Sequence, residues 1–179
     1  MIGQKFVFFV KISYYKPMTK TITTNSEAET FKMAEKLAGR LKGGEVIGLY
    51  GDLGAGKTVF SQGLCAGLGC EKKVQSPTFV LLKVYPVQNK KIKQICHIDA
   101  YRVTSFKDLE TIGAEEYLKD KNTVVLIEWA GKLDLEKYSH LIKVKLEILG
   151  EEKRRIKISG KNKAPQGPKK RPQSWRQPD

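Results

Sequence analysis

The sequence predicts a single α/β domain in which a mixed β-sheet is flanked by helices, and three observations support this prediction. The chain has 179 residues, of which 40% are hydrophobic, and this suffices for one domain with a core. Apolar residues recur at helical spacing early in the chain, whereas pairs of apolar runs joined by polar turns follow later. A glycine-rich loop separates a strand-like run from a helix-like run.

One strand and one helix are predicted ahead of this loop. Residues 20–24 predict a short strand. Ser26 and Glu29 have the spacing of a capping box, which opens a helix. Apolar residues then repeat at helical spacing until the pair Gly43 and Gly44 ends the pattern; they are Phe31, Ala34, Leu37, Ala38 and Leu41.

The loop itself, residues 51–58, reads GDLGAGKT and has the pattern of a phosphate-binding P-loop. Residues 45–50 predict a buried strand before it, and residues 58–68 predict a helix after it. Glycines let backbone N–H groups surround a phosphate, and the helix N-terminus adds positive potential. In such a loop Lys57 reaches the β- and γ-phosphates, and the Thr58 hydroxyl binds Mg²⁺. The predicted fold is therefore P-loop NTPase-like, and a nucleotide is the expected ligand.

Four further elements are predicted after the loop. In chain order they are an antiparallel hairpin, a short helical stretch, a buried strand and a second hairpin that turns at Gly150. We expect them at residues 79–98, 106–118, 123–127 and 141–158.

The chain ends are expected to lie outside this domain, which we assign to residues 18–160. Residues 1–17 form an N-terminal extension, for which Met18 is an alternative start. Residues 161–179 are dominated by Pro, Gly, Gln and basic residues, and we expect them to be disordered. Residues 151–179 contain ten Lys/Arg against three Asp/Glu, half of a net charge of +14. A polyanion such as RNA is one interpretation of this charge, and a solvated basic end is the other.

The composition also bears on the compartment. No apolar run has the length of a membrane span. The apolar stretch at residues 6–10 is short and lacks a small-residue cleavage site, so we expect no signal peptide and no membrane partner. Three cysteines without a C-x-x-C pair favour a reducing, cytoplasmic location. His97 lies in an apolar strand and is interpreted as a core or sheet-face histidine.

A P-loop needs a partner carboxylate at the end of a neighbouring strand, and two positions qualify. Asp99 follows the apolar run 95–98, and Glu128 follows the run 124–127. Four apolar residues before a carboxylate are the Walker-B pattern, which Glu128 fits better. A helix cap or a surface salt bridge is the alternative for either acid. The candidate catalytic residues are Lys57, Asp99 and Glu128, and which of the two acids positions the attacking water stays open.

The expected base is adenine. A GTPase reads guanine with an Asn-Lys-x-Asp motif; Lys132 and Asp134 have this spacing, but Gly131 stands where asparagine is needed. No Asp-x-x-Gly switch accompanies them, so ATP is favoured over GTP. A small-molecule kinase usually carries an arginine-bearing lid, and Arg102 is the sole arginine between the loop and Glu128. One arginine is little for holding a second phosphorylated substrate, so a kinase is less favoured but stays an alternative.

Several motifs in one order resemble the bacterial TsaE (YjeE) family, the ATPase component of the machinery that makes threonylcarbamoyladenosine in tRNA. These motifs are the P-loop, the tripeptide Ser-Pro-Thr at 76–78, HIDAYR at 97–102 and VLIEW at 125–129. The resemblance covers roughly residues 20–158. It departs from the family at Val59, where the family often has threonine, and in the two chain ends, which have no counterpart.

The resemblance implies a set of site residues. Mg²⁺ would be held by Thr58 and Glu128, with Asp99 close by and needed for hydrolysis. Ser76, Pro77 and Thr78 would form a switch-like loop that senses the γ-phosphate. Glu27 and Gly150 match positions near the base, and Trp129 matches a tryptophan beside the active site, for which a core indole is the other interpretation. The loop residues around ATP or ADP would be Gly51, Asp52, Leu53, Gly54, Ala55, Gly56, Lys57 and Thr58.

The resemblance also implies partners. In this family TsaD, with TsaB, transfers the threonylcarbamoyl group to tRNA, using an adenylate made by TsaC. TsaE binds the TsaD–TsaB complex and hydrolyses ATP to reset it, so tRNA is an indirect partner and DNA is not expected. Two alternatives remain: a small-molecule kinase, which would pass the γ-phosphate to an acceptor, and an RNA-binding module that uses the basic end.

Overall fold

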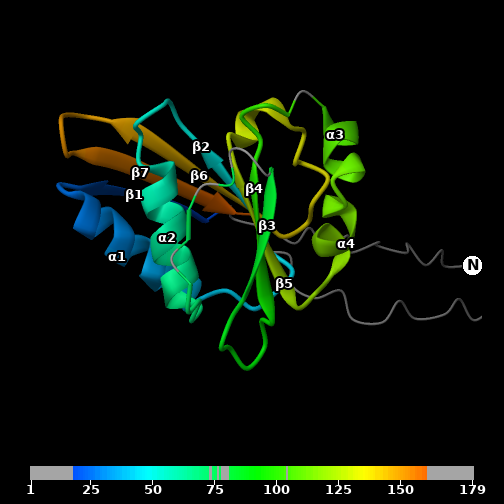
Figure 1. Cartoon of the computed structure of the whole chain (residues 1–179). Helices are drawn as coiled ribbons and strands as arrows, with labels where there is room; N and C mark the ends of the chain where they lie inside the picture. The colour runs from blue at the N-terminus through cyan, green and yellow to red at the C-terminus, as the bar shows by residue number, and fades with distance from the viewer. Residues whose placement is uncertain (1–17, 73, 76, 78–80, 104, 161–179) are drawn as a thin grey trace, which may run out of the picture.

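The computed structural model describes residues 18–72, 74–75, 77, 81–103 and 105–160. The predicted N-terminal extension and the basic end at 161–179 therefore lie outside the described residues. Within the described part, a seven-stranded sheet carries helices on its faces (Figure 1). This arrangement confirms the predicted mixed α/β class.

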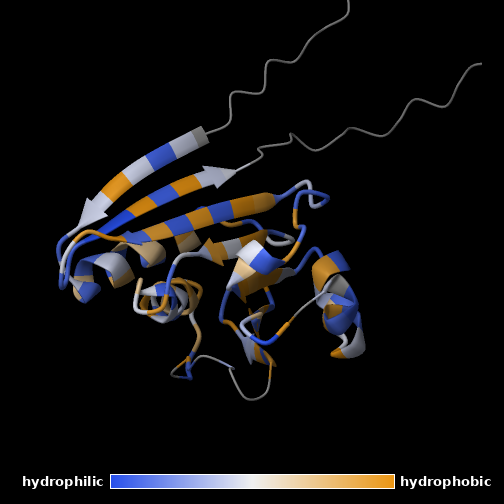
Figure 2. Ribbon diagram, turned by 90° about the horizontal axis from the view of Figure 1, so that it is seen from above, coloured by the Kyte–Doolittle hydropathy of each residue, from blue (hydrophilic) through white to orange (hydrophobic). Residues whose placement is uncertain are grey.

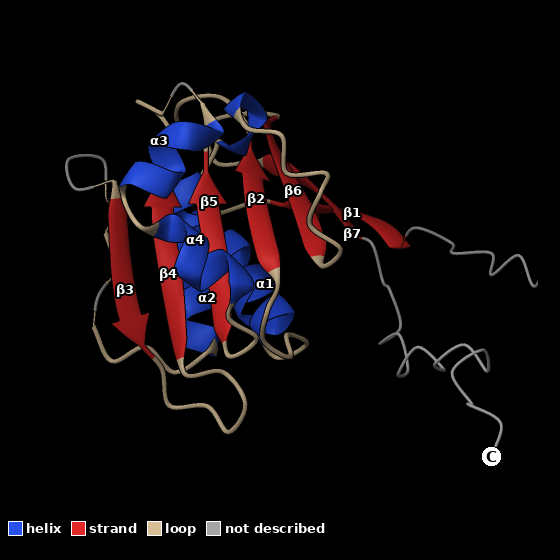
Figure 3. Ribbon diagram, turned by 90° about the vertical axis from the view of Figure 1, so that its right-hand side faces the viewer, coloured by secondary structure: helices blue, strands red, loops and turns tan. Residues whose placement is uncertain are grey.

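The strands lie in the order β1-β7-β6-β2-β5-β4-β3 across the sheet (Figure 3). β2 pairs in parallel with β5 and β6, and β4 pairs in parallel with β5. The pairs β3–β4, β6–β7 and β1–β7 are antiparallel, which confirms both predicted hairpins. The bounds are β1 Met18–Thr24, β2 Val46–Tyr50, β3 Leu82–Pro86, β4 Gln94–Asp99, β5 Thr123–Glu128, β6 Leu141–Ile148 and β7 Arg154–Gly160.

The helices divide between the two faces of the sheet. α1 (Glu27–Ala38) and α2 (Lys57–Gly67) lie on one face, and α3 (Phe106–Thr111) and α4 (Ala114–Lys119) lie on the other, as Figures 1 and 3 show. A short 3₁₀ helix, η1 (Ala130–Lys132), follows β5 and packs near β2. None of the described helices is long and apolar enough to cross a membrane.

The alternation of side chains along β5 decides which residues meet α2. Val124 and Leu126 join the apolar cluster beneath α1 and α2, whereas Val125 and Ile127 join the cluster beneath α3 and α4. All six residues of β5 are buried, as expected for a strand covered on both faces. By the same alternation, Glu128 at the end of β5 faces α2.

The strands β1, β7 and β6 show the two-residue alternation of hydrophobic and hydrophilic residues as coloured bands in Figure 2.

Two helix predictions are wrong in detail. α1 ends at Ala38 and not near Leu41, because the next backbone bonds are short-range ones, from Arg40 N–H to Leu37 O and from Leu41 N–H to Ala38 O. Leu41 still packs against the core from this tighter turn. The predicted helical stretch 106–118 is two helices, because Gly113 adopts φ 74 between α3 and α4.

Three smaller features of the fold concern the cap of α1, the start of β3 and the cysteines. Ser26 caps α1 by accepting a bond from Glu29 N–H at 3.1 Å, but the Glu29 carboxylate bonds to Asn25 N–H at 2.8 Å, one residue before the cap. β3 begins at Leu82, later than predicted, and residues 79–80 lie outside the described part. The three cysteines are free, and Cys65 and Cys96 are buried.

The two helices on the α2 face approach each other closely through small residues. A Cβ at Gly63 would lie 2.3 Å from the carbonyl oxygen of Phe31, and one at Gly67 would lie 2.7 Å from Cβ of Ala38. This approach fixes α2, and with it the loop that precedes α2, against the rest of the domain.

We therefore expect Gly63→Ala to lower the free energy of unfolding by about 1–3 kcal/mol, because the added methyl group overlaps backbone atoms of α1. Gly39→Ala is the matched control, since the nearest atom to its Cβ is 3.9 Å away. Thermal unfolding followed by circular dichroism measures both. Equal melting temperatures for the two variants would contradict the close approach of α1 and α2.

Candidate functional site

The predicted P-loop connects the end of β2 to the start of α2. Gly51 is required there for two reasons: its φ is 147, and a Cβ on it would lie 2.4 Å from the carbonyl oxygen of Leu146 in β6. Gly56 precedes α2 with φ 93, and α2 begins with Lys57 and Thr58. The strand, loop and helix thus follow one another as predicted.

Lys57 is folded back onto its own loop. Its Nζ donates hydrogen bonds to the carbonyl oxygens of Gly51 at 2.8 Å and Asp52 at 2.7 Å. The same ammonium lies 3.5 Å from the centroid of the Trp129 ring, within cation–π range. Burial lowers the pKa of Lys57, and the carboxylates of Glu128, Asp52 and Asp99 partly offset this effect.

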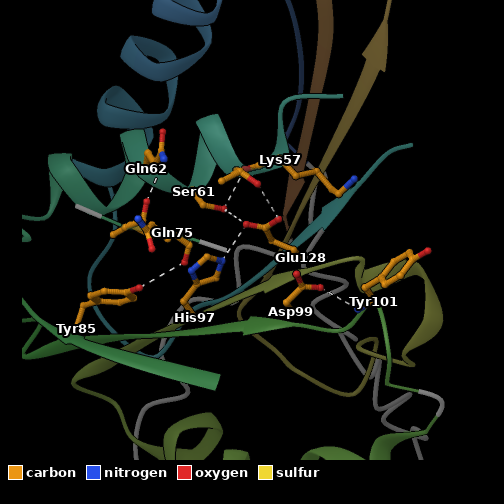
Figure 4. A network of polar contacts seen from close by, with 11 residues as sticks. Lys57, Ser61, Gln62, Gln75, Tyr85, His97, Asp99, Tyr101 and Glu128 are labelled. Carbon is orange, nitrogen blue, oxygen red and sulfur yellow. Dashed lines mark hydrogen bonds and ion pairs between the residues drawn. The ribbon is translucent and has the colours of Figure 1, made fainter. Parts of the chain in front are cut away.

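The two predicted carboxylates lie side by side. Asp99 and Glu128 are the last residues of the parallel strands β4 and β5, and they are register partners. Both are nearly buried, with 3% and 2% of their surface exposed. Thr58 Oγ1 lies 3.4 Å from Glu128 Oε2, and Asp99 Oδ1 accepts the N–H of Tyr101 at 2.9 Å. The sheet edge and the head of α2 therefore meet at this point, as Figure 4 shows.

The donor set at this point fits Mg²⁺. Thr58 offers a hydroxyl oxygen and Glu128 a carboxylate oxygen, while Asp99 adds a second acid beside them. Mg²⁺ in nucleotide sites is usually held by one or two protein oxygens, by water and by substrate phosphates. Thr58 and Glu128 are the residues that would hold it.

Two further residues contact Glu128 that the sequence did not assign to the site. Ser61 Oγ lies 2.8 Å from Glu128 Oε1, and His97 Nε2 lies 2.9 Å from the same oxygen. Both side chains are fully buried. His97 is buried, as expected for a core histidine, but its contact with Glu128 was not predicted. Periodicity carries a signal for both: Ser61 is three residues after Thr58 on α2, and His97 is two residues before Asp99 on β4.

Trp129 is partly buried and contacts the P-loop lysine. Its backbone is left-handed, with φ 59, directly after β5. One side of the indole faces Lys57, and the Tyr101 ring lies 5.1 Å from it, centroid to centroid, at an angle of 57°. Tyr101 is 51% exposed, and Lys132 Nζ bonds to its carbonyl oxygen. The Trp129 ring is thus in contact with both Lys57 and Tyr101.

The remaining predicted residues divide into three groups. Gly150 lies in the β6–β7 turn, which Arg154 links to the P-loop by donating to Gly150 O at 2.9 Å and Gly54 O at 3.1 Å. Glu27 is the first residue of α1 and lines a hollow of about 350 Å³ together with Val59. Pro77 is buried, whereas Ser76 and Thr78 lie outside the described residues.

A larger hollow, of about 530 Å³, opens beside the loop. Gly51 and Asp52 form its boundary with the P-loop, and Trp129 forms another side. Lys132 and Lys145 bring positive charge to the lining, and Asp52 and Glu147 bring negative charge. Because a kinase needs room for an acceptor beside the nucleotide, this hollow bears directly on the kinase alternative.

Comparisons with known proteins agree on one family. A family model described as threonylcarbamoyl adenosine biosynthesis protein TsaE matches residues 24–157. The tRNA threonylcarbamoyladenosine biosynthesis protein TsaE of Aquifex aeolicus is 38% identical over 143 residues, which are 79% of this chain and 96% of that protein. The protein of the same name from Bacillus subtilis is 36% identical over 134 residues, covering 75% of this chain and 80% of that protein.

A solved structure shares the fold. The crystal structure of YdiB from Bacillus subtilis matches with a TM-score of 0.60 at 27% identity, over 82% of this chain and 88% of that chain. The family model covers the P-loop, both carboxylates and the tryptophan that follows Glu128. The chain therefore belongs to the TsaE family, whose members take part in the biosynthesis of threonylcarbamoyladenosine in tRNA.

Proposed function

We propose that this chain is the Mg²⁺-dependent ATPase subunit of tRNA threonylcarbamoyladenosine biosynthesis, and that it binds the TsaD–TsaB complex in the cytoplasm and hydrolyses ATP to reset it. One observation carries the proposal: the head of α2, with Lys57 and Thr58, meets two buried carboxylates, Asp99 and Glu128, at one edge of the sheet. Membership of the TsaE family supports the pathway.

The chain's own groups have distinct roles in this proposal. The loop N–H groups surround the phosphates of ATP, and Lys57 leaves its two carbonyl partners to bind the β- and γ-phosphates. Thr58 and Glu128 hold Mg²⁺, which when bound neutralises charge on the phosphates. Asp99 lies next to Glu128 in register and is our candidate for orienting the attacking water. ATP is proposed over GTP because Gly131 offers no side chain for reading guanine.

Phosphate release from Mg·ATP tests this function directly. We expect slow release by the purified chain alone and a sharp rise when the matching TsaD–TsaB complex is added, because the proposed hydrolysis serves a cycle in that complex. If addition of the TsaD–TsaB complex leaves the rate of phosphate release unchanged, this result counts against the resetting role.

The hollow of about 530 Å³ favours a second candidate, a small-molecule kinase whose acceptor lies beside Asp52 and Trp129. Lys145 is already paired with Glu147 at 2.9 Å, so Lys132 is the lining cation that an anionic acceptor would meet. The two candidates differ in where the γ-phosphate goes. Labelled γ-phosphate that appears on an organic acceptor, and not as inorganic phosphate, would support the kinase.

Replacement of the loop lysine provides a first mutational test. We expect Lys57→Ala to weaken ATP binding by tenfold or more, on the order of 1.4 kcal/mol, because the phosphates lose their charged partner. Hydrolysis is expected to fall below detection. Lys119→Ala is the matched control, since Lys119 forms an exposed ion pair with Glu115 on α4, away from the loop. Unchanged ATP affinity in Lys57→Ala, measured by calorimetry, would remove Lys57 from the site.

The contact between Lys57 and Trp129 gives a spectroscopic test. The chain has two tryptophans, Trp129 and Trp175, so the measurement uses Trp175→Phe to leave Trp129 alone. We expect a change in Trp129 emission on nucleotide binding, because Lys57 must leave the ring face 3.5 Å away to reach a phosphate. The added Lys57→Ala substitution should abolish the change. Emission that stays constant while calorimetry reports saturation would show that Lys57 does not move.

A further inference from the structure

We propose that His97 and Ser61 are positioning residues, which hold one carboxylate oxygen of Glu128 in place so that the other is directed at Thr58. The inference rests on the proposed function, in which Glu128 and Thr58 together hold Mg²⁺. It adds two residues to the site, both of which are fully buried.

The contacts to Glu128 are divided between its two oxygens. Oε1 lies 2.8 Å from Ser61 Oγ and 2.9 Å from His97 Nε2. Oε2 lies 3.4 Å from Thr58 Oγ1. Two donors that converge on one oxygen fix both the position and the plane of the carboxylate. The direction of the second oxygen is then determined before any metal ion arrives, which is what preorganisation of a metal site requires.

Both positioning residues are held by regular structure. Ser61 lies one turn after Thr58 on α2, and its single hydroxyl hydrogen is shared between Glu128 Oε1 and the carbonyl oxygen of Lys57, which lies 2.9 Å away in the preceding turn. His97 lies within β4, on the same face of the sheet as Glu128. Ser61 and His97 are both 0% exposed, so water does not compete for Oε1. The helix and the strand thus clamp the carboxylate from two sides.

The chemistry of His97 argues against a purely structural role. A carboxylate offers no proton, so the hydrogen in this contact must be on Nε2. The other ring nitrogen, Nδ1, is buried and has no hydrogen-bond partner among the residues that the structure describes. A buried polar atom without a partner costs stability, and Ile95, the next residue on this face, is apolar. The hydrogen bond from Nε2 to Glu128 Oε1 is therefore the contact that accounts for a histidine at this position.

The test compares variants that keep or remove a donor to Oε1. His97→Leu and Ser61→Ala each remove one donor, whereas His97→Gln keeps an N–H group near the position of Nε2. Cys96→Ala is the matched control, because Cys96 is the preceding β4 residue, is fully buried and belongs to the cluster on the opposite face. Calorimetry measures the affinity for a non-hydrolysable ATP analogue with and without Mg²⁺, and phosphate release and melting temperature are measured alongside.

We expect the gain in affinity that Mg²⁺ provides to fall about tenfold in His97→Leu and Ser61→Ala, as is typical for partners of metal ligands. Affinity without Mg²⁺ should stay the same, because neither residue contacts the phosphates. Phosphate release should fall about 10- to 100-fold. His97→Gln should restore most of the Mg²⁺ response, and Cys96→Ala should leave the response unchanged even where it lowers the melting temperature.

A second comparison separates positioning from general damage. In a Glu128→Ala background, His97→Leu should change the Mg²⁺ response no further, since the residue acts only through Glu128. Independent effects of the two substitutions would overturn the inference, and so would a normal Mg²⁺ response in His97→Leu or an equal loss in Cys96→Ala. If His97→Leu does not fold, Ser61→Ala carries the test. Failure of the proposed function looks different: the unmodified chain would then show no Mg²⁺ response or no hydrolysis.

Discussion

The buried carboxylate of Glu128 is the group on which the arrangement of the site depends. A carboxylate with 2% of its surface exposed is costly unless donors and positive charge surround it. Here the compensation comes from Ser61 and His97, from the positive N-terminal end of α2 and from the ammonium of Lys57. These groups belong to different elements, so α2 must be held close to β5 and β4. The glycine contacts between α1 and α2 contribute to that hold.

The buried charge of Lys57 is compensated by nearby groups in the same way. With Nζ bound to two loop carbonyl oxygens and covered by Trp129, the charge of Lys57 is satisfied inside the site. A phosphate must therefore replace existing contacts and not simply fill a space. The indole that covers Lys57 also contacts Tyr101, which is half exposed at the surface. An exchange at Lys57 therefore also changes the surroundings of Trp129 and, through the ring contact, those of Tyr101.

Local patterns predicted much of the fold and part of the site. Alternating apolar runs predicted both hairpins, and the glycine spacing predicted the loop between β2 and α2. The helix ends were less predictable, because Gly113 interrupts a helical pattern through a φ of 74 that its neighbours do not reveal. Likewise, α1 ends at Ala38 although Leu41 keeps the spacing, since a tighter turn also delivers Leu41 to the core.

The loop, the two acids that end apolar runs and each motif of the family resemblance were readable in the sequence, because each is formed by residues close together in the chain. The pairing of Asp99 with Glu128, and the contacts of Ser61 and His97 with one oxygen of Glu128, depend instead on how distant segments fold together. Ser61 and Glu128 are 67 residues apart in the chain, and His97 and Glu128 are 31 apart. The parallel pairing of β4 with β5, and the packing of α2 above them, brings these side chains together. A histidine or a serine in an apolar pattern carries no local sign of the partner that it meets across such distances.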